Sequence, residues 1–179
     1  MRKFFLVVLV CTLTILSWAP AQAVSIEAQA AFDQLASLEG TWIGKPEAEG
    51  EETQAEAEAY GAITHEIDVS ANGTVVMETM NPGTPEEMIN MYHLDGEDLV
   101  LTHYCAGGNQ PRMRLNREAS TASNLVFDFD GGTNLDPAVD HFIHSAQISF
   151  EGDRLTSAWT SYAGGEKAGG MTFHLARSK

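Results

Sequence analysis

The clearest structural signal in this sequence is EIDVSANGTVVM, residues 66–77. It holds two short runs rich in alternating apolar residues, joined by a turn that contains Asn-Gly, a pair typical of hairpins. With a three-residue loop, Ala71-Asn72-Gly73, apolar residues meet on one face of the hairpin and polar residues occupy the other. The predicted apolar pairs are Val69 with Val75 and Ile67 with Met77. The polar face carries Glu66, Asp68 and Ser70.

Two more hairpins follow from the same pattern. A three-residue loop at Leu94-Asp95-Gly96 pairs Met91 with Leu99 and Ile89 with Leu101. It places Asn90 and Asp98 on the outer face. A two-residue loop at Glu151-Gly152 matches Ile148 to Leu155 and brings His144 near Trp159.

The remaining sequence extends this pattern into a closed sheet. Residues 125–130 and 171–175 also alternate, and about eight or more strands joined mostly by tight turns favour an antiparallel up-and-down β-barrel, which has no open edge and can hold a cavity. Residues 26–38 have helical spacing and predict one short amphipathic helix. Residues 45–59, rich in Glu and Ala, fit a long solvated loop or a frayed edge.

The start of the chain predicts export. Residues 1–23 have a basic beginning, an apolar run and a small-x-small ending at Ala21-Gln22-Ala23, which together indicate a secretory signal. Lipid attachment at Cys11 is disfavoured, because Val10 stands where a small residue is needed. We therefore expect a periplasmic or extracellular protein whose mature part, residues 24–179, is a single barrel domain.

Composition narrows the range of partners. The chain has 25 acidic and 10 basic residues and a formal net charge of −15. Such a surface repels phosphate backbones and anionic lipids, so we expect neither nucleic acid binding nor membrane insertion. Of the two cysteines, only Cys105 remains after cleavage of the signal. No intramolecular disulfide is then expected, and stability must come from packing.

The two ends of the predicted barrel resemble those of a known superfamily. Gly40-Thr41-Trp42, which follows the helix and opens the first strand, resembles the Gly-x-Trp signature of lipocalins and their calycin relatives. In that superfamily an arginine at the end of the last strand packs over the signature tryptophan, and Arg177 ends the last strand here. The resemblance therefore implies a contact between Trp42 and Arg177, a cation–π pair of about 0.5 to 2 kcal/mol.

The middle of the chain carries the same resemblance further. Residues 73–96 and 102–113 are similar to small exported lipocalin-like proteins with no established activity, so the resemblance implies a fold and no function. Haem-binding barrels of the nitrobindin type share the Gly-x-Trp-x-Gly pattern of residues 40–44. The rest of their pattern does not match this sequence, and no cofactor is predicted.

Residues 102–112, THYCAGGNQPR, form the most unusual segment. On the predicted registers the side chains of Leu99, Leu101, His103 and Cys105 point into the barrel. A buried polar group without a partner costs about 1 to 3 kcal/mol. His103 is therefore expected to have a hydrogen-bond partner, either another core side chain, such as His144 or the Gln110 amide, or a ligand.

This inward histidine has two interpretations. In the structural one, its hydrogen bond only fixes the register of the barrel. In the functional one, polar groups line a ligand cavity and apolar side chains form its wall. The predicted ligand-binding residues are His103, Cys105, Asn109, Gln110, Arg112, His144 and Trp159, with Leu101 and Met113 completing the wall.

The main alternative to a binding protein is a barrel enzyme, or a haem or metal protein, centred on His103 and Cys105. Two residues apart on a strand, their Cβ atoms lie about 6 to 7 Å from each other. This is too far for a direct hydrogen bond, and a metal would need a third ligand from another strand. His141 and His144, three apart, point to opposite faces. Residues 128–134 fit an acidic turn better than a calcium loop.

We therefore expect an exported protein that binds a small, partly apolar molecule in a barrel cavity. A third interpretation is a solid barrel that acts through its acidic outer face.

Overall fold

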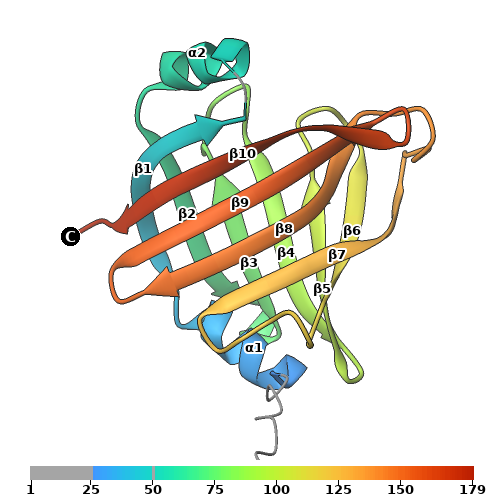
Figure 1. The fold of residues 1–179 in the computed structure, drawn as a ribbon. Coiled ribbons are helices and arrows are strands. Elements are labelled where there is room, and N and C mark those ends of the chain that lie inside the picture. Colours follow the sequence, from blue (N-terminus) through green and yellow to red (C-terminus); the bar gives the residue numbers. More distant parts are fainter. Residues whose placement is uncertain (1–25, 50) are drawn as a thin grey trace, which may run out of the picture.

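A computed structural model describes residues 26–49 and 51–179; the predicted signal, residues 1–23, lies outside the described residues. Within them, ten antiparallel strands form a closed barrel in which consecutive strands pair and the last pairs with the first (Figure 1). The predicted all-β up-and-down barrel with a short N-terminal helix is confirmed. The strands are β1 (Gly40–Ala48), β2 (Ile63–Ser70), β3 (Val75–Met80), β4 (Met88–Asp95), β5 (Asp98–Tyr104), β6 (Gln110–Leu115), β7 (Asn124–Thr133), β8 (Phe142–Glu151), β9 (Arg154–Ala163) and β10 (Glu166–Arg177).

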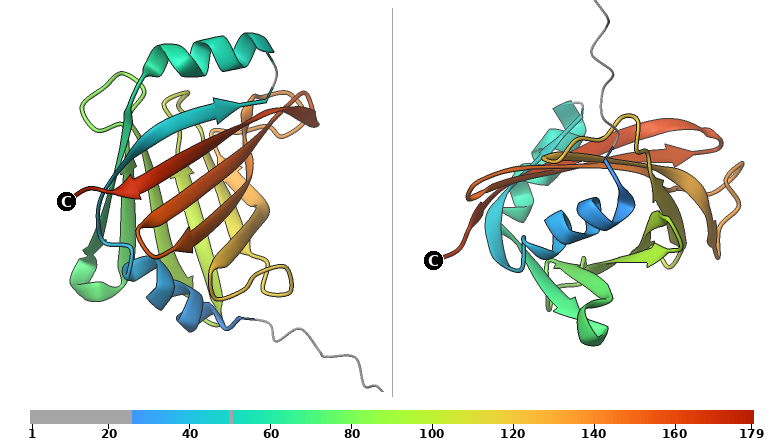
Figure 2. Two further views of the ribbon diagram at one scale, coloured as in Figure 1. Left: turned by 60° about the vertical axis from the view of Figure 1, so that its left-hand side comes forward. Right: turned by 90° about the horizontal axis from the view of Figure 1, so that it is seen from below.

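Two helices lie at opposite ends of the barrel (Figures 1 and 2). Helix α1 (Ala28–Ala36) lies across one end, where Phe32 and Leu35 are buried and the helix contacts β3, β4 and β5. Helix α2 (Glu51–Tyr60) lies at the other end and packs on β1. In the described part of the chain, neither helix has the length and apolar character needed to cross a bilayer.

Helix α2 corrects the loop or frayed edge predicted for residues 45–59. Strand β1 runs on to Ala48, and the Glu- and Ala-rich segment after it becomes helical, as these strong helix formers prefer. Gln54 accepts a hydrogen bond from the Ala48 backbone N–H at 2.9 Å, and Ala57 is fully buried. This tertiary contact stabilises a helix whose own apolar pattern is too weak to predict it.

The barrel closes at the α1 end as the motif implied. Trp42 is fully buried, its indole N–H donates to the Leu38 carbonyl at 2.8 Å, and the Arg177 guanidinium lies 4.3 Å from the ring centroid. The predicted contact between Trp42 and Arg177 is confirmed. Gly44 is required nearby, because a Cβ there would lie 1.8 Å from the His174 carbonyl oxygen on β10.

The predicted register of the first hairpin is wrong by one residue. The connection has four residues, with Ala71 and Asn72 both at positive φ, and Ser70 pairs with Val75. The observed pairs are Val69 with Val76 and Ile67 with Glu78. Because side chains alternate between faces, this shift turns Glu78 inward and Met77 outward.

The second and third hairpins are also shifted. Gly96 and Glu97 form a two-residue turn with Gly96 at φ 64°, so Tyr92 faces Leu101 and Asn90 faces His103. Asn90 is fully buried, which corrects its predicted place on the outer face. In the third hairpin the turn is Gly152-Asp153, and the pairs are Ile148 with Ser157, Phe150 with Leu155 and Ala146 with Trp159. His144 falls in a bulge of β8 instead of facing Trp159.

Candidate functional site

A chain of buried polar side chains crosses the inner face of β2 to β5. Glu78 is 3 % exposed, and one of its carboxylate oxygens lies 2.7 Å from His65 Nδ1. The other oxygen accepts hydrogen bonds from the Asn90 amide at 2.8 Å and from the Tyr92 hydroxyl at 2.9 Å. Asn90 in turn bonds through Oδ1 to His103 Nδ1 at 2.7 Å. Four strands thus contribute to one continuous network.

This network determines which nitrogen of His103 carries the proton. Asn90 donates its amide N–H to Glu78, so its carbonyl oxygen is the atom that faces His103. A carbonyl oxygen only accepts, so the proton is on Nδ1 of His103 and the lone pair is on Nε2. That Nε2 atom is buried and has no hydrogen-bond partner among the described residues.

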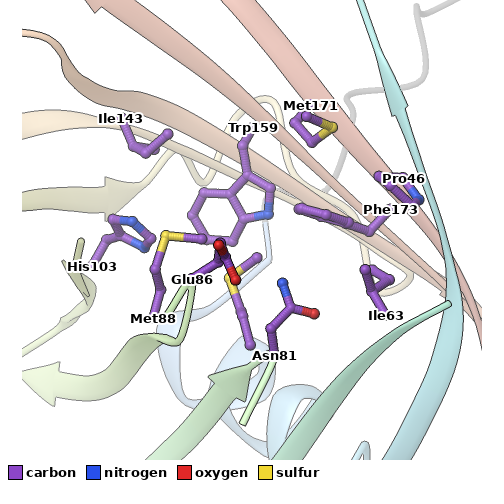
Figure 3. Close-up of a pocket in the computed structure, with 11 residues that line it drawn as sticks. Pro46, Ile63, Asn81, Glu86, Met88, His103, Ile143, Trp159, Met171 and Phe173 are labelled. Carbon is purple, nitrogen blue, oxygen red and sulfur yellow. The ribbon is translucent and has the colours of Figure 1, made fainter. Parts of the chain in front are cut away.

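The His103 side chain lines a cavity of ≈ 160 Å³, whose lining residues are drawn in Figure 3. The cavity lies toward the barrel end covered by α2, since Pro46 of β1 also lines a hollow beside that helix. Apolar and sulfur-containing side chains dominate the lining. The cavity residues are Pro46, Ile63, Met80, Asn81, Glu86, Met88, His103, Ile143, Trp159, Met171 and Phe173.

Burial determines the charge state of the site. It lowers the pKa of His103 to about 4, although the Glu78 charge acts in the opposite direction. Burial also raises the pKa of Glu78, but the hydrogen bonds and charge of its partners outweigh this effect, and the net pKa lies below its ordinary value. The pKa of Tyr92 is raised well above its ordinary value by burial and by Glu78. At neutral pH the site therefore holds a neutral imidazole backed by an ionised carboxylate.

Of the seven predicted ligand-binding residues, two line the cavity of the described structure. These are His103, which is 1 % exposed, and Trp159, whose ring lies 5.4 Å from the His103 ring. The partner of His103 is a core side chain, Asn90, and neither of the two examples suggested from the sequence, His144 and Gln110, is that partner. Leu101 and Met113 are fully buried in the barrel, and the wall around the cavity comes from the other apolar residues named above.

The other five predicted residues lie elsewhere. Cys105 lies in the turn after β5, where its sulfur accepts a hydrogen bond from the Gly107 N–H at 3.4 Å. Arg112 is half exposed and pairs with Asp130 on β7. The remaining three are held by local contacts: Asn109 donates to the His141 carbonyl, Gln110 accepts from Thr133, and His144 stacks on Tyr162 at 3.9 Å.

The sequence-based prediction missed Glu78, Asn90, Tyr92 and the two methionines beside them, Met80 and Met88. A signal was present, because Glu78 interrupts the apolar run from Val75 to Met80 on a strand that must bury one face. A charged residue in such a position is either turned outward or paired inside. The predicted register, which pairs Met77 with Ile67 inside, implies the first option for Glu78, and the structure has the second.

No family model matches this chain, and no curated protein matches it. The class of the protein is therefore described by its fold, a closed ten-strand antiparallel barrel whose architecture is compatible with calycins.

Proposed function

We propose that this protein is an exported, calycin-like binding protein that holds one small, largely apolar molecule in the barrel cavity at His103. The observation that carries the proposal is the unpaired, buried Nε2 of His103, a residue that lines a mostly apolar cavity. A neutral acceptor of this kind is satisfied by a ligand that brings an N–H or O–H group.

Cavity size limits the ligand. Drug-sized ligands occupy pockets of about 300 to 1,000 Å³, whereas an apolar protein cavity of about 150 Å³ holds one benzene-sized molecule. The cavity here, ≈ 160 Å³, belongs to the second group. The ligand class is therefore a single ring, or an aliphatic molecule of similar size, with one hydrogen-bond donor.

The same size argues against haem. The histidine is suitable, because it has an unpaired Nε2 and a hydrogen-bonded Nδ1. A tetrapyrrole is larger than the drug-sized ligands that already need more space than this cavity provides. The residues fit an axial ligand to iron, and the cavity does not fit the macrocycle.

Phenol and toluene test the proposal, since they match in size and differ in the donor. Phenol should bind about fivefold more tightly, because one net hydrogen bond contributes about 1 kcal/mol. His103→Asn retains an amide near the Nδ1 position to donate to Asn90 but removes the Nε2 lone pair, so it should bind the two molecules equally. Titration calorimetry and the fluorescence of Trp159 measure both affinities.

Two controls test predicted site residues that lie outside the cavity. His144→Asn should leave the preference for phenol unchanged, because His144 stacks outside the cavity on Tyr162. Alkylation of Cys105 should also leave it unchanged, whereas a Cys-dependent activity would be lost. Failure of both molecules to bind, or an unchanged phenol preference in His103→Asn, would rule out the proposed role.

A further inference from the structure

Two methionines share the cavity corner with His103. Met80 and Met88 are directly opposite each other on β3 and β4, and the next inward residue of β4, Asn90, is opposite His103 on β5. Directly paired residues have Cβ atoms about 4.5 to 5.5 Å apart, and diagonal neighbours remain within reach of long side chains. The side chains of Met80, Met88 and His103 line the cavity, and Figure 3 shows Met88 and His103 there.

The contacts bring one of these sulfurs close to the polar network. The Met80 sulfur accepts a hydrogen bond from the Asn90 amide at 3.3 Å, and the same Asn90 side chain holds His103 Nδ1. Met80 is 1 % exposed, so its sulfur is withdrawn from water. Two thioether side chains and an imidazole with an unpaired nitrogen thus line one cavity from three adjacent strands.

This donor set has a definite chemical preference. Thioethers are soft ligands that select Cu(I), and a neutral imidazole suits copper as well. Two neutral thioethers and a neutral imidazole leave a bound monovalent ion with a charge of +1, and the buried Glu78 carboxylate can balance it through Asn90. A histidine held through its second nitrogen is also the usual arrangement for a metal ligand.

We propose that the cavity binds a soft monovalent metal ion, Cu(I), through Nε2 of His103 and the sulfur atoms of Met80 and Met88. The Trp159 ring, which lies 5.4 Å from the His103 ring and lines the same cavity, flanks the ion and offers it a π face. Both the metal ion and the organic ligand proposed above would use His103 Nε2, so they compete for the cavity. Binding of either one does not require the other.

The molecule supplies a matched control for the methionines. Met77 and Met91 are also directly opposite each other on β3 and β4, but they are on the outer face. The double variants Met80→Leu/Met88→Leu and Met77→Leu/Met91→Leu therefore each remove two sulfur atoms, the first from the inner face and the second from the outer face of the same strand pair. Cys105→Ser serves as the background for all proteins, so that the thiol does not compete for the metal.

The first experiment uses Ag(I), a redox-inert probe for Cu(I), in chloride-free buffer. One equivalent should shift the ¹³C-methyl NMR signals of Met80 and Met88, leave those of Met77 and Met91 in place, and quench Trp159. Methyl shifts confined to Met77 and Met91, or spread evenly over all methionines, would overturn the site. This measurement needs no substitution in the cavity.

The second experiment measures Cu(I) affinity by competition with a chromophoric chelator under anaerobic conditions. Substituting residues that only support a metal ligand costs about 10- to 100-fold in affinity. Replacing the inner methionines, or His103 with Asn, should therefore weaken binding at least about tenfold, while the outer pair has no effect. Equal losses for the inner and outer pairs would refute the proposal. Phenol binding without any Ag(I) or Cu(I) binding would refute it as well, and would leave the proposed function intact.

Discussion

Glu78 is the residue on which the interior hydrogen bonds of this barrel converge. An unpaired ionised carboxylate in a protein interior is very costly. Here its oxygens face His65, Asn90 and Tyr92, which satisfy most of its acceptor capacity. The chain continues through Asn90 to His103, so a charge fixed on β3 determines the orientation and tautomer of a side chain on β5.

His103 should make the stability of the protein depend on pH. In the folded protein the pKa of His103 is about 4, below its ordinary value of 6.5. Between pH 6.5 and pH 4 the histidine is therefore protonated in the unfolded chain and neutral in the folded protein. The free energy of unfolding therefore falls as pH drops from 6.5 to 4, by up to about 3 kcal/mol from this group. The contribution of Glu78, whose folded pKa is lowered, is lost at more acidic pH.

Urea unfolding at pH 7, 5.5 and 4 tests this prediction. His103→Asn should have a flatter dependence than the wild type, because the substituted side chain does not titrate. His174→Gln, at an exposed position, should follow the wild type. Parallel curves for the wild type and His103→Asn would contradict the assigned burial effect.

At the scale of elements, the strands were predictable and their registers were not. The alternation in β2, β5, β7 and β10 predicted which faces are buried, as Leu99, Leu101, Leu125 and Phe127 show. The predicted registers of the first two hairpins were chosen to bring apolar residues together inside. The first turn was therefore predicted one residue too short and the second one residue too long. These registers place Glu78 and Asn90 on the outer face. Their burial becomes favourable only when the partners on neighbouring strands are present.

The ladder between β1 and β10 yields a sharper prediction at this scale. Gly44→Ala should destabilise the protein by about 4 kcal/mol or more, because the new methyl would lie 1.8 Å from a β10 carbonyl oxygen and the two strands must separate. Gly169→Ala, on the same pair of closing strands, meets its nearest atom at 3.8 Å and should have a small effect. The midpoints of chemical denaturation measure both. Similar losses in the two variants would mean that close packing is not the reason for Gly44.

At the scale of the whole molecule, the two ends of the barrel have different roles. The α1 end is sealed by apolar residues of the helix and by Trp42 under Arg177. The α2 end holds the cavity and its unpaired imidazole nitrogen. If the cavity binds a ligand as proposed, substitutions at the sealed end should change the stability of the protein without changing ligand affinity.

Arg177→Ala tests this separation. It removes the cation–π contact and a 2.7 Å hydrogen bond to the Glu39 carbonyl, so the free energy of unfolding should fall by about 2 to 3 kcal/mol. Arg112→Ala, at an exposed ion pair, should cost less than about 1 kcal/mol. Phenol affinity, measured where each variant is fully folded, should remain that of the wild type. A parallel loss of stability and affinity in Arg177→Ala would show that the ends are coupled.

The sequence pattern predicted the closed barrel and the short N-terminal helix, and the resemblance to calycins implied the contact between Trp42 and Arg177. These features follow from alternation, turn residues and a short motif, all of which are local in the chain or anchored at its ends. Only the tertiary structure decided that Glu78 and Asn90 face inward and that His103 lines a cavity with one buried ring nitrogen unpaired. A buried polar side chain is stable when partners from other strands reach it within hydrogen-bonding distance, and no local pattern specifies that meeting.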